Sequence, residues 1–267
     1  MNPFVLLPLL CYSYIMAAQS ITTKPFIPDS CNQVDASGLK QGYWIEFSGP
    51  KGSRSYKESR GAYKNGIKDK TWVDYAGEGP ILVKVENFEN GQKKGVTLEL
   101  ENGAIKKEEW YEADQLHGLI RTYSFGSRLS AEIQYNHGIM SGFKNTWYQN
   151  GKKQEEGYYL NGKRDGKAIW YYEDGKKSIE YSYSNGDLEG PMKTYHRNEV
   201  ISTEGTYLHN ELNGSFKEYH TDGTLKSEGN YSNGQKDGQW KEYLPNGELS
   251  KTIKFKRGAE IDSPKKN

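Results

Sequence analysis

Five glutamates recur at a spacing that could serve acid–base chemistry. Glu132, Glu156, Glu180, Glu204 and Glu228 follow one another at 24-residue intervals. Glycosidases use two carboxyl groups about 5–10 Å apart, so a pair of these residues would fit that reaction. However, one glutamate occurs in each copy of a repeat, and each stands near a lysine. This pattern favours cross-strand ion pairs over a catalytic site.

The five histidines are the candidates for a metal site. They are His117, His137, His196, His209 and His220, and His196 and His220 share one repeat register. If each repeat contributes two strands about 4.8 Å apart, equivalent positions lie roughly 10 Å from each other. Ligands of one zinc ion stand about 2.0–2.3 Å from the metal, so this pair cannot share an ion. We therefore expect solvated strand or turn histidines.

Other patterns that mark an enzyme or a cofactor site do not occur in the sequence. There is no nucleophile elbow, phosphate-binding loop, His-Glu-x-x-His or paired Cys-x-x-Cys motif. The two cysteines, Cys11 and Cys31, do not supply the three or four ligands of a zinc site. We predict that the chain is not an enzyme and takes no cofactor, metal or small-molecule substrate.

Aromatic side chains provide most of the bulky apolar surface of this 267-residue chain. They make up 13% of it, with 21 Tyr, 6 Trp and 8 Phe, whereas 27% of the residues are charged. Each buried aromatic removes about 150–250 Å² from water, so we expect a thin core of Tyr and Trp with polar tips in solvent. The net charge of +1 gives no basic field for nucleic acid.

The elements that position these residues are repeats. Glycines recur every 24 residues, one aromatic stands five residues after each glycine, and another stands seventeen after it. These register positions are Gly142, Trp147, Tyr159, Gly166, Tyr171, Tyr183, Gly190, Tyr195, Tyr207, Gly214, Tyr219, Tyr231, Gly238, Tyr243 and Phe255. With small slips the register extends back to Gly42, and Lys70 replaces one glycine. About nine registers cover residues 42–258.

Each repeat has the pattern of a β-hairpin. Aromatic-rich runs alternate with Asn-Gly and Asp-Gly turns every 10–14 residues, which leaves no room for long helices. Gly157 and Tyr159 point to one face, as do Gly229 and Tyr231, and a glycine leaves a ring space to lie flat. We predict an all-β fold, an elongated antiparallel meander of about nine hairpins with a ladder of rings along one face.

The run Glu-Gly-x-Tyr-x-Asn-Gly-x-x-x-Gly at 156–166 and again at 228–238 resembles the MORN repeat. Gly-x-Trp-x-x-Tyr at Gly238, with Phe in the last place at Gly42, is most similar to its bacterial variant in YwqK-type antitoxin-related repeat proteins. The resemblance covers most of residues 38–258 and implies an extended meander of hairpins. For function it implies toxin neutralisation in some members, and binding to membranes or other proteins in related arrays.

The chain divides into four segments by pattern. Residues 1–20 carry an apolar stretch too short for a typical membrane-spanning helix, which favours a signal peptide, although no Lys or Arg precedes it. A linker follows at 21–37, then the repeat array at 38–258 and a disordered tail at 259–267. We therefore expect a secreted or cell-envelope protein, with a cytoplasmic location as the alternative.

The repeat pattern breaks at residues 48–60. This insertion in the first hairpin carries Lys51, Arg54, Lys57 and Arg60 against a single acidic residue. It is either a contact loop for an anionic partner or a tolerated surface insertion in a capping repeat. Our favoured hypothesis is an exported module for protein–protein interaction or scaffolding. The alternatives are a YwqK-like antitoxin and a module that binds anionic membrane surfaces.

Overall fold

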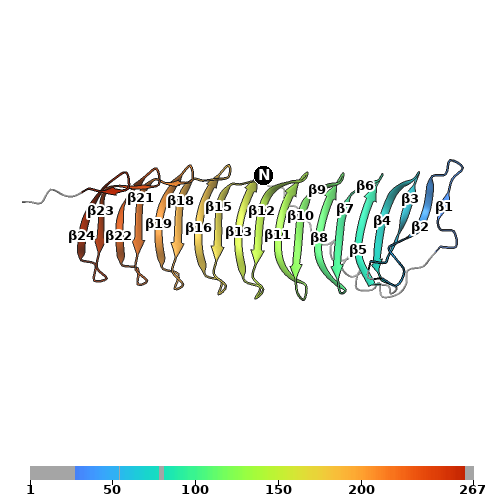
Figure 1. Ribbon diagram of the computed structural model, residues 1–267, viewed down its shortest axis with the longest axis horizontal. Coiled ribbons are helices and arrows are strands. Elements are labelled where there is room, and N and C mark those ends of the chain that lie inside the picture. Colours follow the sequence, from blue (N-terminus) through green and yellow to red (C-terminus); the bar gives the residue numbers. More distant parts are fainter. Residues whose placement is uncertain (1–27, 54, 78–80, 262–267) are drawn as a thin grey trace, which may run out of the picture. The chain divides into compact units, whose positions relative to one another are not determined.

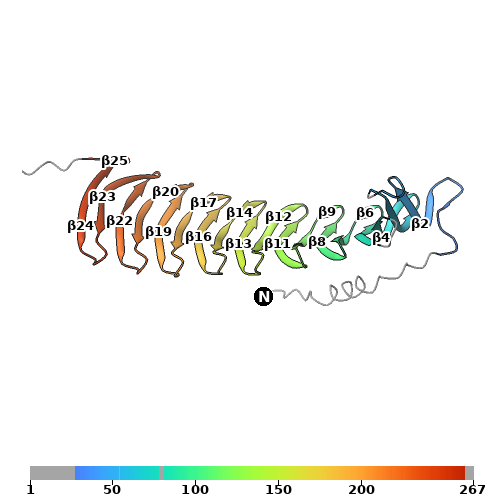
Figure 2. The same cartoon turned by 60° about the horizontal axis from the view of Figure 1, so that its bottom comes forward.

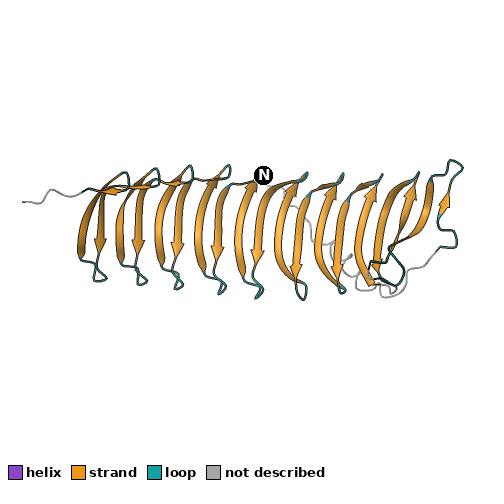
Figure 3. Ribbon diagram, viewed as in Figure 1, coloured by secondary structure: helices purple, strands orange, loops and turns teal. Residues whose placement is uncertain are grey.

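The computed structural model describes residues 28–53, 55–77 and 81–261. The predicted signal peptide at 1–20, the start of the linker and the last six residues lie outside the described residues. Within those ranges every regular element is a strand, and no helix occurs (Figure 3). Consequently, no helix there is long and apolar enough to cross a membrane. The all-β prediction is confirmed.

The chain forms two compact units, Met1–Asp114 and Gln115–Asn267. In both units the strands pair antiparallel with their neighbours in sequence, as the predicted meander requires (Figure 1). The strands of the first unit are β1 (Gln33–Val34), β2 (Lys40–Ser48), β3 (Lys57–Lys64), β4 (Ile67–Ala76), β5 (Ile81–Glu89), β6 (Gln92–Lys93), β7 (Gly95–Glu101) and β8 (Ala104–Glu112).

The second unit holds six hairpins in its described residues, each built on two long strands, with two-residue strands between several of them. Its strands are β9 (Gln115–Leu116), β10 (Gly118–Ser124), β11 (Arg128–Asn136), β12 (Ile139–Trp147), β13 (Lys153–Leu160), β14 (Lys163–Arg164), β15 (Gly166–Tyr171), β16 (Lys177–Ser184), β17 (Asp187–Leu188), β18 (Gly190–Tyr195), β19 (Ile201–Leu208), β20 (Glu211–Leu212), β21 (Gly214–Tyr219), β22 (Leu225–Ser232), β23 (Gln235–Tyr243), β24 (Leu249–Lys256) and β25 (Ala259–Glu260).

Pairing begins and ends slightly outside the predicted array. β1 lies in the segment assigned to the linker and pairs with β2 through Gln33 and Gln41. β25 lies in the segment assigned to the tail and pairs with β24 through Glu260 and Phe255. These short pairs cover part of the outer strands.

The Asn-Gly dipeptides form turns of two geometries. Asn161 and Gly162 both have positive φ, 50° and 81°, as the two-residue turn of a tight hairpin requires. At Asn150-Gly151 only the glycine has positive φ, and its N–H donates to the Tyr148 carbonyl at 2.9 Å to close a four-residue turn. Turns of the two kinds lie at opposite ends of the strands.

Hydrogen bonds between turns hold successive repeats of a unit at a fixed offset. The N–H of Gly186 donates to the Arg164 carbonyl at 2.8 Å, 22 residues earlier, and Gly234 does the same to Leu212. The short strands β14, β17 and β20 run along this edge (Figure 2). At the other edge the Tyr148 hydroxyl donates to the Tyr171 carbonyl at 2.7 Å, 23 residues later. Each repeat is therefore tied to the next at both edges.

Candidate functional site

The register glycines and the aromatics seventeen residues later are cross-strand partners. Gly142 pairs with Tyr159 and Gly238 with Phe255, and the three repeats between them pair in the same way. The glycines of all five repeats have positive φ, where a side chain would be strained. At Lys70, which replaces a register glycine, φ is also positive, 61°. The sequence period therefore reflects a backbone kink repeated once per hairpin.

We call the side of the second unit that carries Tyr159, Tyr183, Tyr207, Tyr231 and Phe255 the ring face. Rings of successive strands are in contact there, because Tyr231 lies 5.2 Å from Phe216 and 5.2 Å from Trp240 between ring centroids. Gly229 makes room for the next ring: a Cβ on it would lie 2.3 Å from the Trp240 side chain. The predicted ladder of rings is confirmed in these repeats, although the ring above Gly229 comes from the neighbouring strand.

A cationic side chain covers the ring face in two of these repeats. The Arg164 guanidinium lies 5.2, 5.0 and 5.6 Å from the ring centroids of Tyr159, Trp170 and Tyr183. Lys236 occupies the same register, with its Nζ 4.0 Å from the Trp240 ring. The intervening repeats carry leucine at this position. At this register the rings are covered either by a cation or by a leucine side chain. The ring face is therefore a structural surface.

The repeated glutamates lie on the opposite side of the second unit, which we call the glutamate face. Each is ion-paired: Glu132 with Arg121, Glu156 with Lys153, Glu180 with Lys167 and Lys177, Glu204 with Lys193, and Glu228 with Lys241. The pairs with Arg121, Lys167, Lys193 and Lys241 join neighbouring strands, as predicted, whereas Lys153 and Lys177 lie on the same strand as their glutamates.

Tyrosine hydroxyls complete the row of the glutamate face. Tyr219 donates to Glu204 at 2.6 Å, and Tyr243 donates to Glu228 at 2.8 Å. The hydrogen bond from Tyr243, together with Lys241, holds the pKa of Glu228 below its usual value. Burial and the bond to Glu204 raise the pKa of Tyr219 to about 12. An ionised, paired carboxylate is not poised as a general acid, so the row is architectural.

The basic residues of the 48–60 insertion do not form one surface. Lys51 and Lys57 are exposed, whereas Arg54 lies outside the described residues. Arg60 is only 3% exposed, forms an ion pair with Glu58 and lies 5.3 Å from the ring centroid of Tyr75. The prediction that Arg60 belongs to a contact loop was wrong, because its position in β3 turns the side chain inward.

The glutamate face breaks its own pattern at the β12–β13 hairpin. Phe143 and Tyr158 are cross-strand partners on this face, 39% and 48% exposed. Ile139 and Leu160, at the ends of the same strands, are 52% and 47% exposed. The pairs in the register of Phe143 and Tyr158 in the next four hairpins are Lys167–Ser182, Pro191–Thr206, Ser215–Asn230 and Gln239–Lys254.

We call Ile139, Phe143, Tyr158 and Leu160 the apolar patch. The register glycine and rings are normal in this repeat, so the repeat pattern of the sequence does not indicate the patch. The signal was the aromatic pair at a register that is polar in the repeats that follow. A feature found in every repeat supports the fold, whereas this exposed aromatic pair is absent from the four hairpins that follow and is the candidate functional site.

The histidines divide into two groups. His196 takes the place of a tyrosine at a turn, with its Nε2 3.0 Å from the Tyr219 carbonyl, in agreement with a structural role. His117 and His137, which sequence reasoning did not pair, have ring centroids 4.6 Å apart. Turns of successive repeats lie side by side, so residues 20 positions apart meet. The sequence pattern does not indicate this offset.

The fold is that of a β-hairpin repeat protein. Three segments, residues 164–185, 212–233 and 236–257, match the family model described as MORN repeat variant. The match supports the MORN repeat family for this array. Such repeats are commonly protein- or membrane-interaction modules and are generally non-catalytic. A comparison with curated proteins finds no matching relative.

Proposed function

We propose that the chain is a non-catalytic scaffold that binds a protein partner through the glutamate face, anchored at the apolar patch. The carrying observation is the Phe143–Tyr158 pair, exposed where the following repeats are polar. Exposed aromatic side chains ringed by charged residues are frequent anchors of protein interfaces. The strand of Tyr158 also carries the Lys153–Glu156 ion pair, and the net charge of the chain is +1, which favours a protein over a polyanion.

The test compares variants in affinity capture from the native host. The double variant F143S/Y158N installs the Ser–Asn pair that the chain itself carries at Ser215 and Asn230, so the hairpin should still fold. The control Q239S/K254N places the same pair in a register that is already polar. We expect one reproducible protein with the wild type and the control, and its loss with F143S/Y158N. Retention by F143S/Y158N would contradict the proposal.

We further propose that the protein acts outside the cytoplasm, in the envelope or after secretion. The support is the apolar leader at residues 1–20. Fractionation and N-terminal sequencing of the native protein test this, and a shortened chain outside the cytoplasm is the expected result. A full-length cytoplasmic chain would instead favour the antitoxin role that the resemblance to YwqK-type proteins implies, and co-expression with a toxic partner would then test that role.

Binding to an anionic membrane surface is the second candidate, favoured by the exposed Lys51 and Lys57. Sedimentation with vesicles that contain anionic lipid, at low salt, separates it from protein binding. If the chain sediments with these vesicles but not with neutral ones, and K51E/K57E abolishes this, the lipid surface is a ligand. Sedimentation that is independent of these lysines would exclude this loop as the contact.

A further inference from the structure

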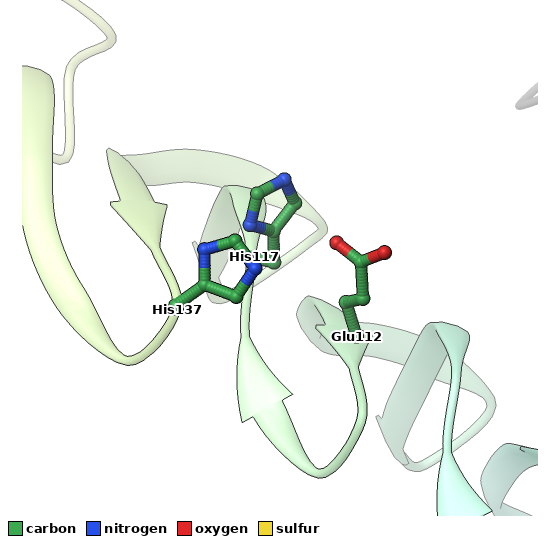
Figure 4. Close-up of side chains that lie close together, drawn as sticks. All are labelled: Glu112, His117 and His137. Atoms are coloured by element: carbon green, nitrogen blue, oxygen red, sulfur yellow. The ribbon is translucent and has the colours of Figure 1, made fainter.

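Two histidines from successive turns at one edge of the second unit lie close together, on either side of the β10–β11 hairpin. His117 lies between β9 and β10, and His137 lies in the turn between β11 and β12. The Gly138 N–H donates to the Leu116 carbonyl at 2.7 Å, which fixes this turn against β9. Figure 4 shows the two imidazoles; it also draws Glu112, the last residue of β8 in the first unit.

The chain contains an internal comparison for this pair. Glu189 and His209 lie 72 residues further on, at the same two register positions, and the His209 Nδ1 lies 3.4 Å from a Glu189 carboxylate oxygen. Side chains at these positions therefore meet in a second repeat as well. The other equivalent pairs from residue 165 onward are Asp165–Asn185, Asn213–Asn233 and Asp237–Arg257, so the double imidazole breaks the pattern.

The geometry of the two rings suits a shared cation. One ligand nitrogen of His117 lies within 4.8 Å of one on His137. Two imidazole nitrogens on one zinc ion, each about 2.0–2.1 Å from it, are at most about 4.2 Å apart. His137 is exposed, so a small side-chain rotation closes the difference.

His137 also has the outer hydrogen bond of a metal ligand. Its Nδ1 lies 2.7 Å from the Asn136 side-chain oxygen. An amide oxygen at this distance accepts the Nδ1 hydrogen, so Nε2 is the atom through which His137 would coordinate a metal. Ligating histidines usually have such a partner, because it fixes the tautomer and the ring orientation.

We propose that His117 and His137 form a surface site for a divalent transition metal, with water completing the coordination. Imidazole nitrogen suits Cu²⁺, Ni²⁺ and Zn²⁺, and affinity should follow the order Cu²⁺ > Ni²⁺ and Cu²⁺ > Zn²⁺. The bound ion would connect the β9–β10 junction to the next turn and stabilise the folded state by mass action.

Calorimetric titration of the untagged full chain with ZnCl₂ and with NiCl₂ tests this site. We expect one equivalent to bind the wild type. H137N should weaken binding at least about 10-fold, and H117N likewise, since each removes one ligand; N136A, which removes the outer hydrogen bond, should weaken it by about 10–100-fold. The two histidine variants keep the fold: Asn stands at the register of residue 137 in Asn161 and Asn185 with positive φ, and at that of residue 117 in Asn213.

The matched control is H209N, which removes the histidine of the equivalent Glu189–His209 pair and should leave metal affinity unchanged. The melting temperature gives a second readout, because metal should raise it in the wild type and in H209N but not in H137N. Equal binding by the wild type and H137N, or no binding of either ion by the wild type, would overturn the proposal. Neither outcome depends on the protein-binding role of the apolar patch.

Discussion

At the scale of single residues, the positive φ of the register position explains why glycine occupies it in nearly every repeat. Lys70 stands where eight other repeats have glycine, and it adopts the same left-handed conformation, with φ at 61°. For a residue with a Cβ this conformation costs roughly 1 kcal/mol or more. We predict that K70G raises the free energy of unfolding of the first unit by about 1 kcal/mol, as measured by urea denaturation.

The reciprocal substitution is the control for Lys70. Gly166 has φ at 76°, and a Cβ on it would meet nothing within 4 Å. The cost of G166K is therefore backbone strain without a steric clash, and we expect a loss of about 1 kcal/mol. If K70G destabilises the protein while G166K leaves it unchanged, the conformational explanation of the register glycine is incorrect.

A second class of glycine is required by the space that a ring occupies. Gly229 has an ordinary strand conformation, yet a Cβ on it would lie 2.3 Å from the Trp240 ring. Gly157 has the same register but faces Ala168, with its nearest contacts at 3.3–3.5 Å. We predict that G229A destabilises the protein by about 1–3 kcal/mol through overpacking, and that G157A changes stability by less than about 0.5 kcal/mol. Thermal or urea denaturation of the two variants decides this.

At the scale of strands, the tyrosine–glutamate row makes stability depend on alkaline pH. The folded-state pKa of Tyr219 is about 12, above the value of 10.0 for a free tyrosine. Below pH 10 both states hold the proton, and the stabilisation is complete. Between about pH 10 and 12 the unfolded chain releases the proton first, so the free energy of unfolding falls as pH rises.

We predict that Y219F removes part of this alkaline loss and lowers stability at pH 7 by about 1 kcal/mol, because the hydrogen bond to Glu204 is lost. The measurement is urea denaturation at intervals from pH 8 to 12. Absorbance of tyrosinate near 295 nm, recorded for the folded protein and for the chain in denaturant, follows the proton directly. An unchanged pH profile in Y219F would assign the alkaline loss to other groups.

The strands and their order follow from the sequence because a 24-residue period combined with turn residues allows little else. The turn geometry did not follow, since the same Asn-Gly dipeptide closes a two-residue turn at Asn161 and a four-residue turn at Asn150. Loop length decides between them, and the strand ends that set it depend on pairing. Ion pairing of the glutamates was predictable, as it needs only the neighbours of one register.

The candidate sites were less predictable than the fold because they depend on departures from the repeat. Phe143 and Tyr158 look ordinary in a sequence rich in aromatics, and only their pairing places them on the glutamate face. In the sequence Arg60 ends a run of basic residues, which suggested an exposed loop. In the structure it lies in β3 and its side chain is buried. The meeting of His117 and His137 depends on the offset between turns, which emerges only from the hydrogen bonds of the folded edge.

At the scale of the whole molecule, the repeats of the second unit are interchangeable modules. Strand pairing in its described residues joins only neighbouring hairpins, so the stability of such an array is a sum over repeats and their interfaces. The bonds at both edges span fixed offsets of 22 and 23 residues. Removing one whole period should therefore rejoin equivalent surfaces.

We predict that deletion of residues 190–213 gives a folded protein with a smaller free energy of unfolding. Glu189 then precedes Gly214 as Asn213 does in the native chain, and Lys217 takes the cross-strand place of Lys193 opposite Glu180. Deletion of residues 202–213, half a period, reverses the direction of every later strand relative to the earlier ones. Because glycines, rings and edge bonds then no longer correspond, this variant should lose cooperative unfolding in circular dichroism. Equal stability of the two deletions would show that the repeats do not depend on their register.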